Sequence, residues 1–167
     1  ERYNLASRLD TWVITTLFAF LHKRQDDIRN IEYFAINLSG QSLCDKKIHA
    51  LIVKLLDSKL VPAEKIVFEI TETVAISNIT DATQFISSIK QHGCRFALDD
   101  FGSGMSSFAY LKKLPVDFLK IDGLFVKDIV DDPIDYAMVK SINEVGHIMG
   151  LETVAEFVEN DAILEKL

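Results

Sequence analysis

Two adjacent aspartates, Asp99 and Asp100, come directly after the apolar run Phe-Ala-Leu. Gly102 and Gly104 follow them and give the backbone freedom to turn. Two carboxylates this close repel each other, so one would take up a proton at neutral pH unless a cation lies beside them. The pair therefore predicts a site for chemistry. The alternative is that Asp100 only caps a helix that begins near Ser103.

Four more polar side chains stand at or near the ends of apolar runs: Asn37, Glu69, Lys120 and Glu156. An amide oxygen and several carboxylates form the hard ligand set that Mg²⁺ or Mn²⁺ prefers. Two such ions about 4 Å apart can activate a bridging water and stabilise an in-line phosphoryl displacement. Lys120 would position that water or a phosphate oxygen. Its alternatives are a salt bridge to Asp122 or a place at the rim.

The elements that must position these side chains alternate between strand and helix. Hydrophobic spacing predicts strands over 31–38, 65–71, 95–98, 118–122 and 151–158. It predicts helices over 2–22, 43–59, 80–92, 106–114, 135–149 and from 160 onward. No strand pair is joined by a hairpin signal, so we expect parallel βαβ units with right-handed crossovers.

The position of the polar residues decides between the two folds built from such units. In a (β/α) barrel, the carboxyl ends of all strands surround one mouth, so consecutive strands can aim side chains at one point. In an open doubly wound sheet, the same residues would spread along an edge, and the site would be confined to a switch point. We therefore predict an α/β fold of the TIM-like barrel type.

Composition excludes several classes of protein. The chain has 167 residues, is 49% hydrophobic and carries a net charge of −7. It can bury a substantial core, but its acidic balance argues against a protein that coats DNA. No apolar run approaches the roughly 20 residues of a membrane span, so we expect no membrane contact by this segment. Cys44 and Cys94 form no motif, which favours a reducing compartment and a cytoplasmic location.

Five short motifs in order resemble the EAL domain family of bacterial cyclic di-GMP phosphodiesterases. They are Asn37-Leu38-Ser39, Glu69-Ile70-Thr71-Glu72, Asp99-Asp100-Phe101-Gly102, Leu119-Lys120-Ile121-Asp122 and Ala155-Glu156-Phe157-Val158-Glu159. The resemblance covers the chain, so that residues 1–167 are expected to be one partial domain of this type. It implies a TIM-like barrel that, with two Mg²⁺ or Mn²⁺ ions, hydrolyses cyclic di-GMP to the linear dinucleotide pGpG.

The resemblance also implies roles for the matching positions. The implied metal ligands are Asn37, Glu69, Asp99, Asp100 and Glu156. The implied catalytic residues are Lys120, Asp100 and Glu156, of which Glu156 completes the metal and water site. Glu72 would anchor the loop 101–107, while Asp122 and Glu159 would support the site or the substrate. The same loop and the short helix after it are the family's usual dimer contact, which implies a homodimer.

Two features of the chain depart from the family pattern. It begins downstream of the place where the Glu-Ala-Leu signature should lie, and it stops before the last two strands, so we expect an incomplete barrel. A barrel with open edges would be unstable or self-associating when isolated. The family also suggests fusion to sensor or GGDEF-type domains in the full-length protein. Phe157 stands where many members have glycine.

Two alternatives stay open. The first is a catalytically inactive relative that acts as a cyclic di-GMP receptor or as a protein-interaction module. The second is an unrelated metal-dependent barrel enzyme that acts on a sugar phosphate or a carbonyl substrate. The second would need the same oxygen ligands, but it does not predict all five motifs. An intact Glu-Ala-Leu upstream would favour the phosphodiesterase over the receptor.

Overall fold

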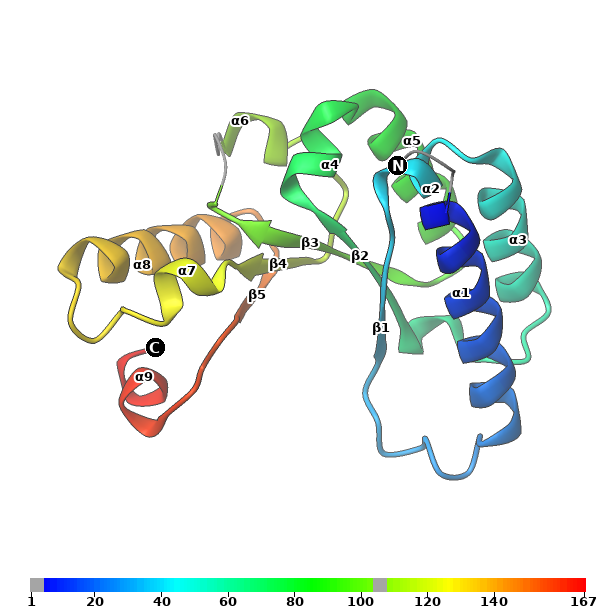
Figure 1. Cartoon of the computed structure of the whole chain (residues 1–167), viewed down its shortest axis with the longest axis horizontal. Helices are drawn as coiled ribbons and strands as arrows, with labels where there is room; N and C mark the ends of the chain where they lie inside the picture. Colours follow the sequence, from blue (N-terminus) through cyan, green and yellow to red (C-terminus); the bar gives the residue numbers. More distant parts are fainter. Residues whose placement is uncertain (1–4, 104–107) are drawn as a thin grey trace.

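A computed structural model describes residues 5–103 and 108–167 of the chain. Its centre is a sheet of five parallel strands, shown in Figure 1. They are β1 Phe34–Asn37, β2 Ile66–Thr71, β3 Arg95–Phe101, β4 Phe118–Ile121 and β5 Glu152–Ala155. Their order in space is their order in the chain, β1-β2-β3-β4-β5. Because the order never reverses, the described sheet has no switch point, and the predicted α/β barrel architecture is favoured over the doubly wound sheet.

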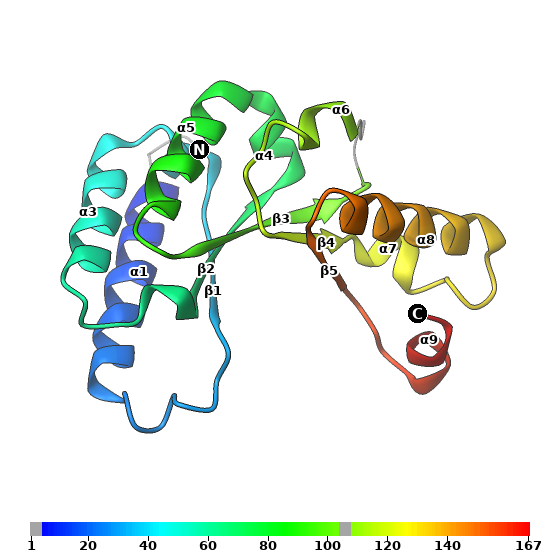
Figure 2. The same ribbon diagram turned by 180° about the vertical axis from the view of Figure 1, so that it is seen from behind.

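A helix precedes β1, and one or more helices follow each strand. They are α1 Leu5–Lys23, α2 Gly40–Leu43, α3 Lys46–Asp57, α4 Glu72–Ser77, α5 Ile79–Lys90, α6 Phe108–Leu111, α7 Gly123–Val126, α8 Pro133–Ile148 and α9 Asp161–Lys166, with a 3₁₀ turn η1 at Ala63–Lys65. Figures 1 and 2 show α1 and α3 at one end of the sheet and α8 and α9 at the other. No helix in the described ranges is long and apolar enough to cross a membrane.

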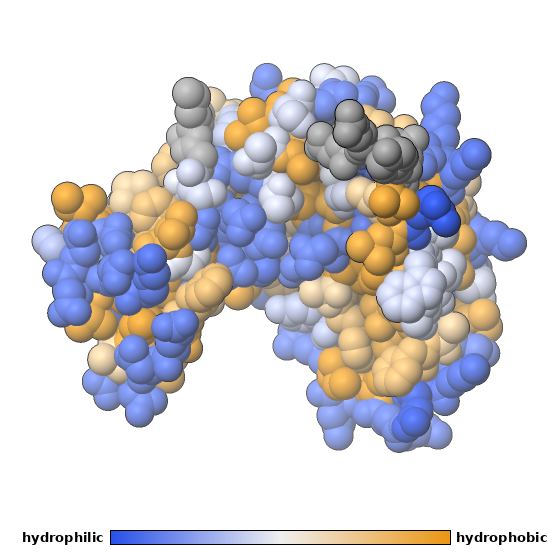
Figure 3. Space-filling model, viewed as in Figure 1, coloured by the Kyte–Doolittle hydropathy of each residue, from blue (hydrophilic) through white to orange (hydrophobic). Residues whose placement is uncertain are grey.

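The main core lies between the sheet and these helices. Alternate strand residues face it, among them Phe68 and Phe96, which are 0% exposed and have ring centroids 5.5 Å apart. The opposite face of the sheet carries a much smaller apolar cluster of Val67, Ala97 and Phe118. In Figure 3, hydrophilic side chains gather over the middle of the sheet, above the hollow between its two ends. The sheet therefore has one packed face and one open face.

Several predicted elements have different bounds in the structure. The helix predicted over 43–59 is confirmed as α3, Lys46–Asp57, which begins later because Asp45 caps it by accepting the Lys47 N–H at 2.8 Å. The preceding helix α2 was not predicted. The prediction for 80–92 missed α4, which Asn78 separates from α5 with a non-helical backbone. Strand β5 is shorter than predicted, and the helix predicted over 106–114 is confirmed only at Phe108–Leu111. Gly104 and the rest of 104–107 lie outside the described residues.

Candidate metal and active site

The two aspartates lie on a bulge within β3, which corrects the prediction that the strand ends at Leu98. Leu98 pairs with Leu119 and Phe101 with Ile121, so β3 uses one more residue than β4 over the same length. Asp100 takes up the extra length with a left-handed backbone, φ 55°. In a regular strand, neighbouring side chains point to opposite faces. The bulge instead lets both carboxylates approach the same site.

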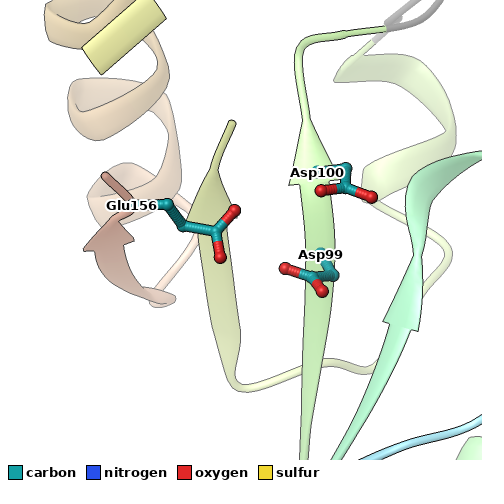
Figure 4. A group of neighbouring side chains, drawn as sticks. All are labelled: Asp99, Asp100 and Glu156. Atoms are coloured by element: carbon teal, nitrogen blue, oxygen red, sulfur yellow. The ribbon is translucent and has the colours of Figure 1, made fainter. Parts of the chain in front are cut away.

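Glu156, directly after β5, completes a cluster of three carboxylates. Oxygen atoms from Asp99, Asp100 and Glu156 all lie within 4.8 Å of one another. Figure 4 shows these three side chains on β3 and at the end of β5. The Ser103 hydroxyl donates to the Asp100 backbone oxygen at 2.9 Å, and neither Gly102 nor Ser103 is helical. The alternative that Asp100 caps a helix beginning near Ser103 falls on residues 104–107, which lie outside the described part of the chain.

Lys120 of β4 connects this cluster to β2. Its Nζ lies 2.6 Å from Asp99 Oδ1, 2.9 Å from Glu156 Oε1 and 3.3 Å from Glu69 Oε2. Its side chain is only 16% exposed. Lys120 therefore forms its ion pairs with Asp99, Glu156 and Glu69 and is largely buried. The two alternatives, a salt bridge to Asp122 and an exposed lysine at the rim of the site, are wrong.

The ionisation of the cluster shows an excess of negative charge. Burial raises the pKa of Glu69, and the charges of Asp99 and Glu156 add to the rise, while Lys120 opposes it. Loss of solvent, followed by the charge of Asp99, raises the pKa of Asp100. Burial alone would lower the pKa of Lys120, but its hydrogen bonds to Asp99 and Glu156 raise it above its ordinary value. One lysine cannot neutralise four carboxylates, so the donor set fits a divalent cation.

Asn37 ends β1 beside Glu69. The two residues are register partners in a parallel pair, so they occupy the same face of the sheet. The Leu38 N–H donates to the Glu69 backbone oxygen at 2.8 Å and fixes the end of β1 against β2. Asn37 is exposed. The structure thus brings the predicted amide ligand to the open face, next to one of the carboxylates.

Glu72 lies at the start of α4 and is 1% exposed. Its Oε2 accepts the Gly102 N–H at 3.1 Å, two residues after Asp100. Its Oε1 accepts a hydrogen bond from the Tyr110 hydroxyl of α6. Glu72 thus contacts the described part of the loop 101–107. Sequence reasoning missed Tyr110, because nothing in its local pattern distinguishes it from an ordinary apolar residue of a short helix.

The other two predicted supporting residues, Asp122 and Glu159, differ in their surroundings. Asp122 is buried and caps α7 by accepting the Leu124 N–H at 2.8 Å. Its own N–H donates to the Phe101 backbone oxygen at 3.1 Å, which ties β4 to the bulge. Glu159 is exposed beyond β5. Asp122 thus supports the backbone around the site in this structure, while the structure gives Glu159 no role.

Phe157 adds a feature that the sequence only hinted at. It has φ 54°, a left-handed conformation that glycine adopts most easily. Its ring lies directly on Gly123, where an added Cβ would meet the Phe157 Cδ2 at 2.0 Å. Gly123 therefore makes room for the ring that replaces the glycine of many family members. Phe157 is 64% exposed and directly follows Glu156 in the chain.

Comparison with known proteins matches the model of the EAL domain family to residues 1–167. The chain is 43% identical over its whole length to the cyclic di-GMP phosphodiesterase PdeB of Shewanella oneidensis, of which it spans 19%. It is 36% identical to PdeF of Escherichia coli, with 99% of the chain and 22% of that protein aligned. The chain thus spans about a fifth of the length of these curated relatives.

Solved structures share the fold. The crystal structure of the FimX EAL domain superposes with a TM-score of 0.90 at 28% identity, over 99% of this chain and 66% of that one. The PaMucR phosphodiesterase in complex with c-di-GMP gives a TM-score of 0.91 at 28% identity, over 100% of this chain and 68% of that one. About a third of each solved chain therefore has no counterpart here. With the family model matching from end to end, the chain belongs to the EAL domain family.

Proposed function

We propose that this chain forms the catalytic part of a phosphodiesterase that hydrolyses one phosphodiester bond of cyclic di-GMP and releases pGpG. The observation that carries the proposal is the convergence of Asp99, Asp100 and Glu156 within 4.8 Å. Lys120, which contacts two of these carboxylates, adds a positive charge to the same face. Curated relatives that bear the name cyclic di-GMP phosphodiesterase support the choice of substrate.

Two Mg²⁺ or Mn²⁺ ions are the proposed cofactors, held by the oxygens of Asn37, Glu69, Asp99, Asp100 and Glu156. Bound ions of this kind supply Lewis acidity and lower the pKa of water. The acidic donor set fits them, since the four carboxylates exceed the single lysine in charge. It does not suit zinc, which prefers sulfur and nitrogen ligands.

The chain's own residues account for the remaining chemistry. Water attacks phosphorus and gives up a proton, the bond to the ribose 3′ oxygen breaks, and solvent water protonates the departing oxygen, so one proton is released and one is taken up. Glu156 can accept the proton lost by the attacking water. The Lys120 ammonium, held in place by Asp99 and Glu156, stabilises the negative charge that grows on the phosphoryl oxygens. Asp99 and Asp100 would hold the ions, because the bulge lets both side chains approach the same site.

The test is hydrolysis of cyclic di-GMP by the full-length protein with Mg²⁺ and with Mn²⁺. The Asp99→Asn variant keeps the shape of the side chain but loses its charge, so we expect at least about a hundredfold loss of turnover. Its control is Asp131→Asn, an exposed acid on the loop before α8, which should leave turnover unchanged. Equal turnover in the wild type and Asp99→Asn would refute the metal assignment.

Calorimetric titration with cyclic di-GMP separates the enzyme from the receptor. Binding together with release of pGpG supports the phosphodiesterase. Binding without hydrolysis at saturating metal would make the chain a receptor and overturn the proposed activity. Binding of neither the nucleotide nor Mn²⁺ would refute both readings and favour an interaction module.

Three further predictions concern the setting of the domain. Fusion to sensor or GGDEF-type domains is supported by the length of the curated relatives, of which this chain spans 19% to 25%. The proposed homodimer contact uses the loop after Asp100 and α6, but residues 104–107 of that loop lie outside the described part of the chain. The cytoplasmic location remains a prediction from cysteine usage alone.

A further inference from the structure

Asp10 of α1 is a buried carboxylate that none of the site motifs includes. It is 8% exposed, and one of its oxygens, Oδ2, accepts two hydrogen bonds. The Ser42 hydroxyl donates to it at 2.5 Å, and the Ser39 backbone N–H donates at 2.8 Å. A buried carboxylate needs such partners, because removing its charge from water is costly. The two bonds tie α1 to the turn that follows β1.

That turn begins directly after Asn37. Ser39 is the N-cap of α2, but its own side chain makes no capping bond, and its N–H is held by Asp10 instead. On the other side, the Leu38 N–H donates to the backbone oxygen of Glu69 at 2.8 Å. The chain leaving Asn37 is thus held from two directions, by the sheet at Leu38 and by α1 at Ser39.

β1 is short, with four residues, and Asn37 is the last of them. The pairing of β1 with β2 stops at Asn37, so the backbone that follows keeps its place through the hydrogen bonds of Leu38 and Ser39. Loss of the bond at Ser39 would loosen the backbone next to Asn37, so the Asn37 side chain would be the first of β1 to move.

We propose that Asp10 is a positioning residue for Asn37. By fixing Ser39, it keeps the Asn37 side-chain amide beside Glu69 at the carboxyl ends of β1 and β2. There the amide oxygen can take part in binding the metal. The assignment rests on the proposed function, in which Asn37 is a ligand. Asp10 itself contacts the turn and not the reacting atoms, so its effect passes through the backbone of residues 37–39.

Three variants of the full-length protein test this role. Asp10→Ala removes the accepting oxygen. Asp10→Asn keeps a carbonyl oxygen in the same place, and since both bonds go to one oxygen, it should restore most of what alanine loses. Ile14→Val is the matched control, because Ile14 is fully buried one turn further along α1 and its apolar side chain can make no hydrogen bond to the turn. It loosens the packing of α1 without removing the bond to Ser39.

Two readouts decide the outcome. Calorimetry without nucleotide should show about tenfold weaker Mn²⁺ binding for Asp10→Ala, and near wild-type binding for Asp10→Asn and Ile14→Val. NMR should show the Asn37 side-chain amide resonance shifted, and the Ser39 amide exchanging faster with solvent, only in Asp10→Ala. An unshifted Asn37 resonance in folded Asp10→Ala, or an equal loss of Mn²⁺ binding in Ile14→Val, would overturn the proposal.

The two readouts also separate this inference from the proposed function. If the wild type binds no Mn²⁺, the metal assignment fails, while the Asn37 and Ser39 signals still report whether Asp10 positions the turn. If the wild type binds Mn²⁺ and hydrolyses cyclic di-GMP but Asp10→Ala matches it in both readouts, the function stands and the role of Asp10 is refuted.

Discussion

The two faces of the sheet differ in role, although the same strands form both: one face packs the core and the other carries the candidate site. On the helix side, Phe68, Phe96 and Leu119 are 0% exposed in one continuous core. On the open side, Val67, Ala97 and Phe118 form a small apolar cluster, and toward the carboxyl ends charged residues replace apolar ones. Because side chains alternate along a strand, each strand supports the core with one set of residues and the site with the other. Stability and chemistry can therefore be changed separately.

The largest effect on the open face is expected from Lys120→Met. The substitution removes the only positive charge that contacts Glu69, Asp99 and Glu156 among the described side chains. We expect turnover of cyclic di-GMP to fall at least about a hundredfold, since a charge that stabilises the transition state is lost. The thermal midpoint should fall more in EDTA than with Mg²⁺, because the ion relieves repulsion among the carboxylates. Turnover within tenfold of the wild type would contradict this role.

Phe96→Ala tests the other face. Phe96 is 0% exposed and packs against Phe68 and Phe85, so the cavity should lower the free energy of unfolding by about 3–5 kcal/mol. Turnover per folded molecule should change little. Chemical denaturation followed by circular dichroism measures the first quantity, and hydrolysis corrected for the folded fraction measures the second. A loss of turnover as large as that of Lys120→Met would contradict the claim that the helix-side face affects stability and the open face affects catalysis.

A smaller effect is expected at Gly123 and Phe157, the pair next to Glu156. Gly123→Ala places a Cβ 2.0 Å from the Phe157 ring, so the ring must move. Since Glu156 is the adjacent residue, we expect turnover to fall about tenfold at most, as for a modest displacement of a catalytic group. Phe157→Gly should instead raise the free energy of unfolding by about 1 kcal/mol, because it relieves a left-handed backbone. Turnover should recover in the double variant. If turnover does not recover, the loss in Gly123→Ala is not caused by displacement of the Phe157 ring.

The smallest predicted effect concerns the two cysteines. Burial raises the pKa of Cys94, in the helix-side core, to about 12, whereas Cys44 is exposed. Only the thiolate reacts, and it forms as the pH approaches the pKa. Iodoacetamide should therefore label Cys44 and spare Cys94 in the native protein between pH 7 and 9, as read by mass spectrometry. Labelling of Cys94 that rises over this range would show that the helix-side core opens.

Much of this arrangement could be predicted from the alternation of apolar and polar residues and from the glycine and proline residues that end helices and strands. The run Ile-Val-Phe-Glu-Ile-Thr places a single charged residue among largely apolar ones, which is enough to predict β2 and Glu69. The contacts of Lys120 could not be predicted in this way, because they join strands far apart in the sequence. The short helices α2, α4 and α7 were missed because four to six residues carry too little periodicity.

The bulge at Asp99 and Asp100 has a consequence that can be put in genetic terms. Leu98 and Phe101 both face the core although they are three positions apart, which a regular strand does not allow. Deleting the single codon for Asp100 would restore the alternation, keep both apolar residues in place and leave one carboxylate on the open face. One inserted residue is therefore enough to turn a plain buried strand into one that presents two adjacent acids, at no cost to the core beneath it.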